Sequence, residues 1–367
     1  MAQNFPPHKQ DRSSLSEEKR IVSALRRSAP NPLPAETIMF QRLLEKLLAV
    51  FKDGTAATLT LFKVMTPIVL AVRLLQEFDL ISLLAKPLGP AMRLVGLPAE
   101  MGLVWATALL NNIYSAMIVF LSLLKDTPVT SAQATVLGVM VLIAHGLPVE
   151  LSIARKSGPR MLFQAVSRVG SALLLGWMLS TVYGRFDLLQ GPAAVLLQPE
   201  VGTGPAPWGS WLLDQLVNFA SIYAIILSLL GLMRLLEAVG VIGLMNRMLR
   251  PVLRIIGIGP KASAITVIGL TLGISYGGGL IIHGARSGEI DRRDIFYSLT
   301  LMGITHSLIE DTLLLVMLGG DLSGLLWARL AFSLVFVALL VQLARRLPGR
   351  FCDRFLWGPP ETNGGQQ

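Results

Sequence analysis

The chain has little cysteine and few charged residues for its length. Cys352 is the one cysteine among 367 residues, so neither an intramolecular disulfide nor a cysteine-based metal cluster can form. Charged residues make up 15% of the chain and hydrophobic residues 53%, with a mean hydropathy of +0.61. This balance is typical of a polytopic membrane protein and argues against a soluble domain.

Sequence motifs of catalysis and of nucleotide hydrolysis are also missing. We find no P-loop, no HExxH pattern and no nucleophile elbow, so we expect neither an enzyme nor a bound cofactor. No apolar h-region follows the early charges, so no signal peptide is expected. Two histidines and three carboxylates could bind a divalent cation, but they are split between the two halves of the chain. We therefore expect no dedicated metal site.

The charge pattern indicates a membrane surface as a partner. The formal net charge is +9, and the basic residues lie in tails and in loops between apolar runs. Anionic lipid at the cytoplasmic face and the positive-inside rule explain this pattern better than nucleic acid does. We expect a multi-pass protein of the bacterial inner (plasma) membrane with both termini cytoplasmic. A small-molecule substrate is the other expected partner, and a homo-oligomer is an open alternative.

Two halves of the chain repeat each other at an offset of 161 positions. The offset lays His145 on His306 and Arg168 on Arg329, and it holds without a gap over some 125 residues. Two unrelated apolar sequences would match leucines at such an offset, but rarely histidines and arginines. The sequence therefore predicts a tandem duplication.

The repeats define the expected domains. We predict a disordered cytoplasmic tail at 1–35 and an amphipathic interfacial helix at 36–54. The other expected parts follow in chain order: a first repeat at 56–185, an external connection at 186–213, a second repeat at 214–346 and a cytoplasmic tail at 347–367.

Each repeat contains four apolar segments, but the loop charges require an odd number of crossings in each half. The second segment of each repeat is interrupted at its middle, by Asn111 to Ser115 in one copy and by Gly273 to Gly279 in the other. Such interruptions are typical of re-entrant or broken helices. We therefore predict an all-α polytopic fold of two inverted repeats, each with about three transmembrane helices and one re-entrant or broken helix.

The interrupted segments are the predicted substrate site. Their amide, hydroxyl and backbone groups would meet near the midplane and suit a polar solute. The glycines have an alternative explanation, because small residues also allow helices to pack closely. The residues of the predicted substrate site are Asn111, Asn112, Tyr114, Ser115, Ser275, Tyr276, Gly277 and Gly278.

Histidines and carboxylates inside the third segments are the predicted ion- or proton-coupling groups. Charge at membrane depth costs about 2.5–3.5 kcal/mol per residue, so it usually marks a transport path. The residues of this group are His145, Glu150, His306, Glu310 and Asp311. Buried ion pairs that only hold helices together are the alternative.

Helix geometry adds two expectations about this group. On a continuous helix His306 and Glu310 share one face, whereas Gly146 and Pro148 predict a kink or break after His145.

Arg168 and Arg329 lie at equivalent places in the fourth segments. An unpaired arginine there would be costly, so we expect both to be structural charge partners of the acidic residues. By symmetry, the expected partners are Glu150 for Arg168 and Asp311 or Glu310 for Arg329.

The motifs HGLPVE (145–150), HSLIEDT (306–312) and ISYGGGLIIHGARSGEI (274–290) resemble the bacterial nucleoside recognition, or Gate, domain. That domain is found in spore maturation proteins, in the membrane part of ferrous-iron transporters and, more faintly, in concentrative nucleoside transporters. The resemblance covers both repeats and implies a transporter fold. It does not transfer a substrate.

Together these features predict an integral membrane transporter or permease for a small polar solute, nucleoside-like or a small organic acid. It would work by alternating access, with ions or protons coupled through the histidines and carboxylates. A divalent-metal permease and a non-transporting membrane scaffold are the alternatives.

Overall fold

The computed structural model describes residues 80–124, 126–196 and 208–358, with scattered positions from 48 to 78. The chain divides into two units, Met1–Phe51 and Lys52–Gln367, and every helix named below belongs to the second. The predicted tail at 1–35 and most of the predicted helix at 36–54 lie outside the described residues. The side chains of Ser275 and Tyr276 also lie outside them, although their backbone is described as helical.

The regular elements of the described residues are helices, as expected for an all-α fold. Among the described residues, five helical stretches are long and apolar enough to cross a membrane. They cover Ser131–Ser157, Met161–Arg185, Trp208–Ala238, Arg292–Met317 and Ser323–Arg346. The first and the fourth of these stretches each contain a short break. Each reaches the roughly 20 residues that a bilayer core requires. The prediction of an all-α polytopic membrane protein is thus confirmed.

From residue 80 onward, the first repeat contains short helices followed by longer ones. The short ones are α3 (Ile81–Ala85), η1 (Lys86–Leu88) and α4 (Gly89–Leu94). The longer ones are α5 (Met101–Leu110), α6 (Ile113–Leu123), α7 (Ser131–Ile143), α8 (Leu147–Ser157) and α9 (Met161–Arg185).

The second repeat follows the same order, and a short helix comes after it. Its first helices are α10 (Trp208–Ala238), α11 (Val241–Ile256), α12 (Pro260–Leu272) and α13 (Ile274–Arg286). They are followed by α14 (Arg292–Thr305), α15 (Glu310–Met317), the π-helix η2 (Ser323–Ala328), α16 (Arg329–Arg346) and α17 (Gly349–Phe355).

Helix boundaries recur at the offset found in the sequence. Helix α6 begins at Ile113 and α13 at Ile274, which is 161 positions later. Helix α7 begins at Ser131 and α14 at Arg292, again 161 positions later. Equivalent stretches of the two halves therefore form equivalent helices.

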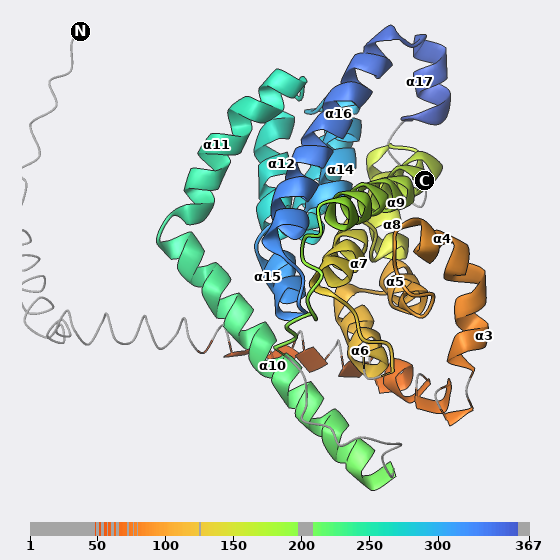
Figure 1. Cartoon of the computed structure of the whole chain (residues 1–367). Coiled ribbons are helices and arrows are strands. Elements are labelled where there is room, and N and C mark those ends of the chain that lie inside the picture. The colour runs from red at the N-terminus through yellow and green to blue at the C-terminus, as the bar shows by residue number, and fades with distance from the viewer. Residues whose placement is uncertain are drawn as a thin grey trace, which may run out of the picture. The chain divides into compact units, whose positions relative to one another are not determined.

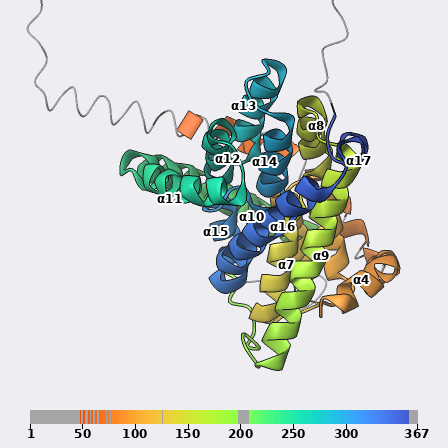
Figure 2. The same cartoon turned by 90° about the horizontal axis from the view of Figure 1, so that it is seen from above.

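The two repeats contact each other reciprocally. Helix α7 of the first packs against η2 of the second, and its counterpart α14 packs against α9 of the first. Such an exchange of contacts is the pattern of a two-fold interface. Within each repeat α9 runs beside α7 and α16 beside α14 (Figures 1 and 2). The opposite orientation of the repeats in the bilayer stays a prediction.

Both second segments are broken, as predicted, but by different means. Between α5 and α6, the Asn112 side chain accepts a hydrogen bond from the Ser115 backbone N–H at 2.9 Å and caps α6. Between α12 and α13, Gly273 has φ +92° and ψ 161°, a conformation open almost only to glycine. An asparagine cap and a glycine turn thus produce the same interruption.

Both third segments are broken as well. After α7, Gly146 adopts a left-handed conformation and Pro148 follows in the first turn of α8, which confirms the break predicted there. After α14, the chain leaves the helix at His306, and Ser307 has φ +49° before α15 begins at Glu310. The prediction that His306 and Glu310 share one face of a continuous helix is therefore wrong.

Candidate functional site

The candidate site lies where the broken third segments of the two repeats meet. His145 follows α7 and His306 follows α14, and both rings are buried. Each ring uses Nδ1 in a hydrogen bond to the carbonyl four residues earlier, that of Val141 at 3.0 Å and that of Met302 at 2.8 Å. The two repeats thus hold their histidines in the same way.

These hydrogen bonds fix which ring nitrogens carry protons. A carbonyl oxygen can only accept, so each Nδ1 carries a proton and each neutral ring presents its Nε2 as a lone pair. The two Nε2 atoms lie 3.2 Å apart. Two lone pairs at that distance repel each other unless a cationic group lies between them. Both Nε2 lone pairs are therefore available to a cation or to a hydrogen-bond donor.

Glu150 in the first turn of α8 completes the centre. Its Oε1 lies 3.6 Å from the Nε2 of each histidine. Its Oε2 forms an ion pair with Arg168 Nη1 at 2.6 Å. Glu150 thus presents one oxygen to the histidines, while Arg168 holds the other.

Arg168 also fixes the unwound backbone beside His145. Its Nε donates to the carbonyl of Ile143 at 2.9 Å, and its Nη2 donates to that of His145 at 3.0 Å. The guanidinium therefore supplies donors to carbonyls that the end of α7 leaves without helical partners. The predicted Arg168–Glu150 pair is formed, and it shapes the site as well as balancing charge.

Arg329 does not repeat this arrangement. Its Nη2 donates to Thr312 Oγ1 at 3.0 Å, and its side chain is 0% exposed. Its Nε and Nη1 have no hydrogen-bond partner. Arg329 thus forms no direct ion pair with Asp311 or Glu310 among the described residues, although Asp311 acts on its guanidinium electrostatically. Aspartate is one methylene shorter than glutamate, and α15 begins two residues later than the counterpart of Leu147.

The acidic pair of the second repeat makes different direct contacts. Tyr114 Oη donates to Glu310 Oε1 at 3.4 Å, which joins α6 of the first repeat to α15 of the second. The Asp311 backbone N–H donates to Ser307 Oγ at 3.4 Å. Neither carboxylate belongs to the group of convergent ligand atoms that the two histidines form with Glu150.

The predicted polar residues of the first interruption are bonded to one another. Asn111 Nδ2 donates to Ser115 Oγ at 2.8 Å, and Asn112 Nδ2 donates to Asn111 Oδ1 at 3.1 Å. Their local role is to end α5 and begin α6. The interruption lies close to the histidine centre, because the Gly146 N–H donates to the carbonyl of Ala108 at 2.9 Å.

The glycines of the second interruption serve close packing, the alternative that the sequence left open. A Cβ on Gly278 would lie 2.8 Å from Ile153 of α8, and one on Gly277 would lie 2.6 Å from the Gly269 Cα. Here too the second segment is tied to the third, because the Leu308 N–H donates to the carbonyl of Leu270 at 3.0 Å. The same connection thus occurs in both repeats.

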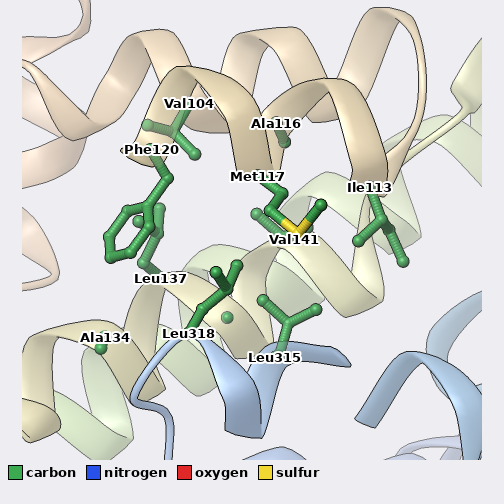
Figure 3. A pocket seen from close by; sticks show the side chains of 11 residues that line it. Val104, Ile113, Ala116, Met117, Phe120, Ala134, Leu137, Val141, Leu315 and Leu318 are labelled. Carbon is green, nitrogen blue, oxygen red and sulfur yellow. The ribbon is translucent and has the colours of Figure 1, made fainter. Parts of the chain in front are cut away.

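Two cavities adjoin the centre. The larger, with a volume of about 20 Å³, is apolar and lies between α5, α6 and α7 of one repeat and α15 of the other (Figure 3). Val141, whose carbonyl accepts from His145, lines it together with Leu315. The smaller, of about 10 Å³, is lined by Glu150 and Arg168 and by Gly303 of α14. Sequence patterns gave no sign of either cavity.

Sequence analysis also missed Thr312, Ser307 and the carbonyls of Val141 and Met302. The carbonyl partners of the histidines could have been predicted. The last carbonyls of a helix have no helical partner, so a histidine that follows a helix can donate to the carbonyl four residues earlier. Thr312 had no such signal, since its role depends on how α15 lies against η2 and α16.

Comparisons with known proteins place the chain among membrane proteins. It is 26% identical over 303 residues to the "Uncharacterized membrane protein YvoD" of Bacillus subtilis (strain 168), covering 81% of this chain and 93% of that protein. A solved structure of a CNTnw variant in an outward-facing state aligns with a TM-score of 0.45 at 14% identity, covering 90% of this chain and 86% of that one. No family model matches the chain, so its resemblance to the Gate domain stays a prediction. With its long apolar helices and this membrane-protein relative, the chain is a multi-pass membrane protein.

Proposed function

We propose that the chain is a membrane transporter that moves a small polar solute by alternating access of its two repeats, with a cation bound at the histidine centre. One observation supports this proposal most directly. The Nε2 atoms of His145 and His306, one from each repeat, lie 3.2 Å apart between broken helices. A site shared by two repeats forms or opens as the repeats move against each other.

A purely structural role explains this centre poorly. Buried ionic groups are often no more stabilising than apolar residues of similar volume. Here two histidines, Glu150 and two arginines are buried together, and four helices end around them. A scaffold protein would gain stability from apolar packing at this place, whereas a transporter requires polar groups and unwound backbone there.

Arg329 favours a small organic acid over a nucleoside as the solute. Its Nε and Nη1 are buried donors with no partner. A carboxylate would bring both the negative charge and the acceptor atoms that a buried guanidinium with free donors lacks, whereas neutral hydroxyl or amide groups bring no charge. A divalent-metal permease is the second candidate, because the three ligand atoms of the histidine centre converge.

The first test is the thermal stability of the purified protein in detergent across small organic acids, nucleosides and divalent metals. A ligand that binds only the folded state raises the unfolding midpoint by mass action. We expect an organic acid to raise it, and Arg329→Gln to remove that shift. Arg254→Gln, at an exposed position of α11, is the matched control and should keep the shift.

A compound that passes this test is then offered, radiolabelled, to proteoliposomes. Uptake into vesicles with wild-type protein, and its loss with Arg329→Gln, would support transport. If a folded wild-type protein responds to none of the compounds, the scaffold alternative is favoured and the proposal is wrong.

The proposed topology has inverted repeats in the bacterial inner membrane, cytoplasmic termini and an external connection at 186–213. Gly191 and Gly349 are both exposed, and a Cβ at either position would meet no atom within 4 Å, so cysteine fits at both. In a Cys352→Ala background, a membrane-impermeant maleimide should label Gly191→Cys in intact cells. Gly349→Cys should react only after the cells are permeabilised. The opposite result would overturn the inverted topology.

A further inference from the structure

The side chains of His145, His306 and Glu150 have the geometry of a metal centre. Their three ligand atoms are separated by 3.2, 3.6 and 3.6 Å. The centre of a triangle with these sides is about 2.0 Å from each atom, which matches the usual bonds of about 2.0–2.2 Å from Zn²⁺ to nitrogen and oxygen. All three residues are buried. An ion could therefore be bound with little movement of its ligands.

The same geometry fits a shared proton less well. An in-line N–H···N hydrogen bond at this separation would hold the ring centroids about 5.5 Å apart. The centroids lie 4.9 Å apart, and the ring planes are tilted by 47°. The two lone pairs thus converge on a point beside the line between the nitrogens, as the lone pairs of two ligands to one ion do. Glu150 Oε1 lies 3.6 Å from both nitrogens, beyond hydrogen-bond distance.

The surroundings provide the support that metal ligands need. Each imidazole donates its other ring nitrogen to a backbone carbonyl, which fixes the tautomer that binds metal through Nε2. Arg168 holds the second oxygen of Glu150 at 2.6 Å, so that Oε1 stays directed toward the histidines. These contacts orient all three ligands before an ion arrives.

We propose that His145, His306 and Glu150 bind one divalent first-row transition-metal ion. Two imidazole nitrogens and one carboxylate oxygen suit Zn²⁺, Co²⁺, Fe²⁺ or Mn²⁺, whereas Mg²⁺ and Ca²⁺ prefer oxygen ligands only. The inference names the cation of the proposed transporter and rests on that proposal for its role in transport. Since the ligands come from both repeats, the bound ion holds the repeats in the arrangement seen here.

Cobalt is a suitable probe, because Co²⁺ bound to nitrogen and oxygen ligands absorbs visible light. The whole protein is purified in detergent, treated with a chelator and titrated with Co²⁺. We expect one ion per chain and a visible spectrum that Zn²⁺ displaces. His306→Ala and His145→Ala should each weaken Co²⁺ affinity on the order of 100-fold, and Arg168→Lys should weaken it about tenfold through Glu150.

His283→Ala is the matched control, because His283 is an exposed histidine of α13 away from the centre. It should leave Co²⁺ affinity unchanged. Glu150→Gln keeps the size of the side chain and should lower affinity in a protein that still elutes as a single folded species. Wild-type protein without stoichiometric Co²⁺ binding, or His306→Ala with unchanged affinity, would overturn the inference.

The same samples separate this inference from the proposed function. If an organic acid stabilises the protein and enters proteoliposomes while Co²⁺ fails to bind, the metal inference is wrong and the transporter stands. If Co²⁺ binds at the centre while no compound or metal ion enters proteoliposomes, the metal site stands and transport is wrong.

Discussion

The two repeats have equivalent helices and equivalent histidines, but they treat their buried arginines differently. Arg168 forms an ion pair with Glu150 and donates to two carbonyls. Arg329 donates to Thr312 and keeps two buried nitrogens without partners. The first repeat therefore holds a completed charge pair, whereas the second holds unused donors. The two halves thus share most of their helices, and their buried arginines differ through the side chains around them.

We expect the largest loss of stability from a substitution that breaks the ion pair of Arg168 with Glu150. Arg168→Met leaves the Glu150 carboxylate buried without its partner, so we expect a loss of about 3–5 kcal/mol in the free energy of unfolding. Arg329→Met removes a guanidinium that forms no direct ion pair among the described residues, so its loss should be less than half as large. Unfolding midpoints in the same detergent compare the two. Equal losses would mean that both arginines are paired.

We expect the next largest loss of stability from a substitution at the glycine break between α12 and α13. Gly273→Ala places a Cβ in a conformation open almost only to glycine, at an expected cost of about 1–3 kcal/mol. Apart from its chain neighbours, no described atom lies within 4 Å of that Cβ, so the cost comes from the backbone and not from a clash. Thermal unfolding measures it. A neutral substitution would show that the break between α12 and α13 does not require this conformation.

The asparagine cap of the first repeat should contribute less. Asn112→Ala removes the acceptor for the Ser115 N–H and should cost about 1 kcal/mol. Asn112→Asp keeps an acceptor at the N-terminus of α6 and is the matched control for the cap. Unfolding midpoints of the two variants separate capping from a change in side-chain volume. Equal losses in both would contradict a capping role.

We expect the smallest change in stability from a substitution that makes the second repeat resemble the first. Asp311→Glu adds the methylene that Glu150 has, so its carboxylate should reach Arg329 and stabilise the fold by about 1 kcal/mol. The gain should disappear when Asp311→Glu is combined with Arg329→Met, which a double-mutant cycle measures. If the solute binds Arg329, the same substitution should also reduce the thermal shift that an organic acid produces. An unchanged shift would argue against that solute site.

The sequence predicted the parts of this fold that depend on neighbouring residues. The offset of 161 followed from matching side chains such as Arg168 and Arg329. The break after His145 followed from Gly146 and Pro148, because both residues act on their own backbone. The break after His306 was missed because no glycine or proline lies there. The residue with a positive φ is Ser307, and serine gives no comparable signal in the sequence.

By itself, the sequence determined a duplicated, all-helical membrane protein with histidines and carboxylates in its apolar segments. Hydropathy and repeated side chains establish those features without knowledge of which helices touch. Only the tertiary structure decided that His145 and His306 meet, that Glu150 faces both, and that Asp311 does not reach Arg329. These outcomes depend on separations of a few ångströms between residues more than a hundred positions apart. They are set by the packing of one repeat on the other, which no local pattern records.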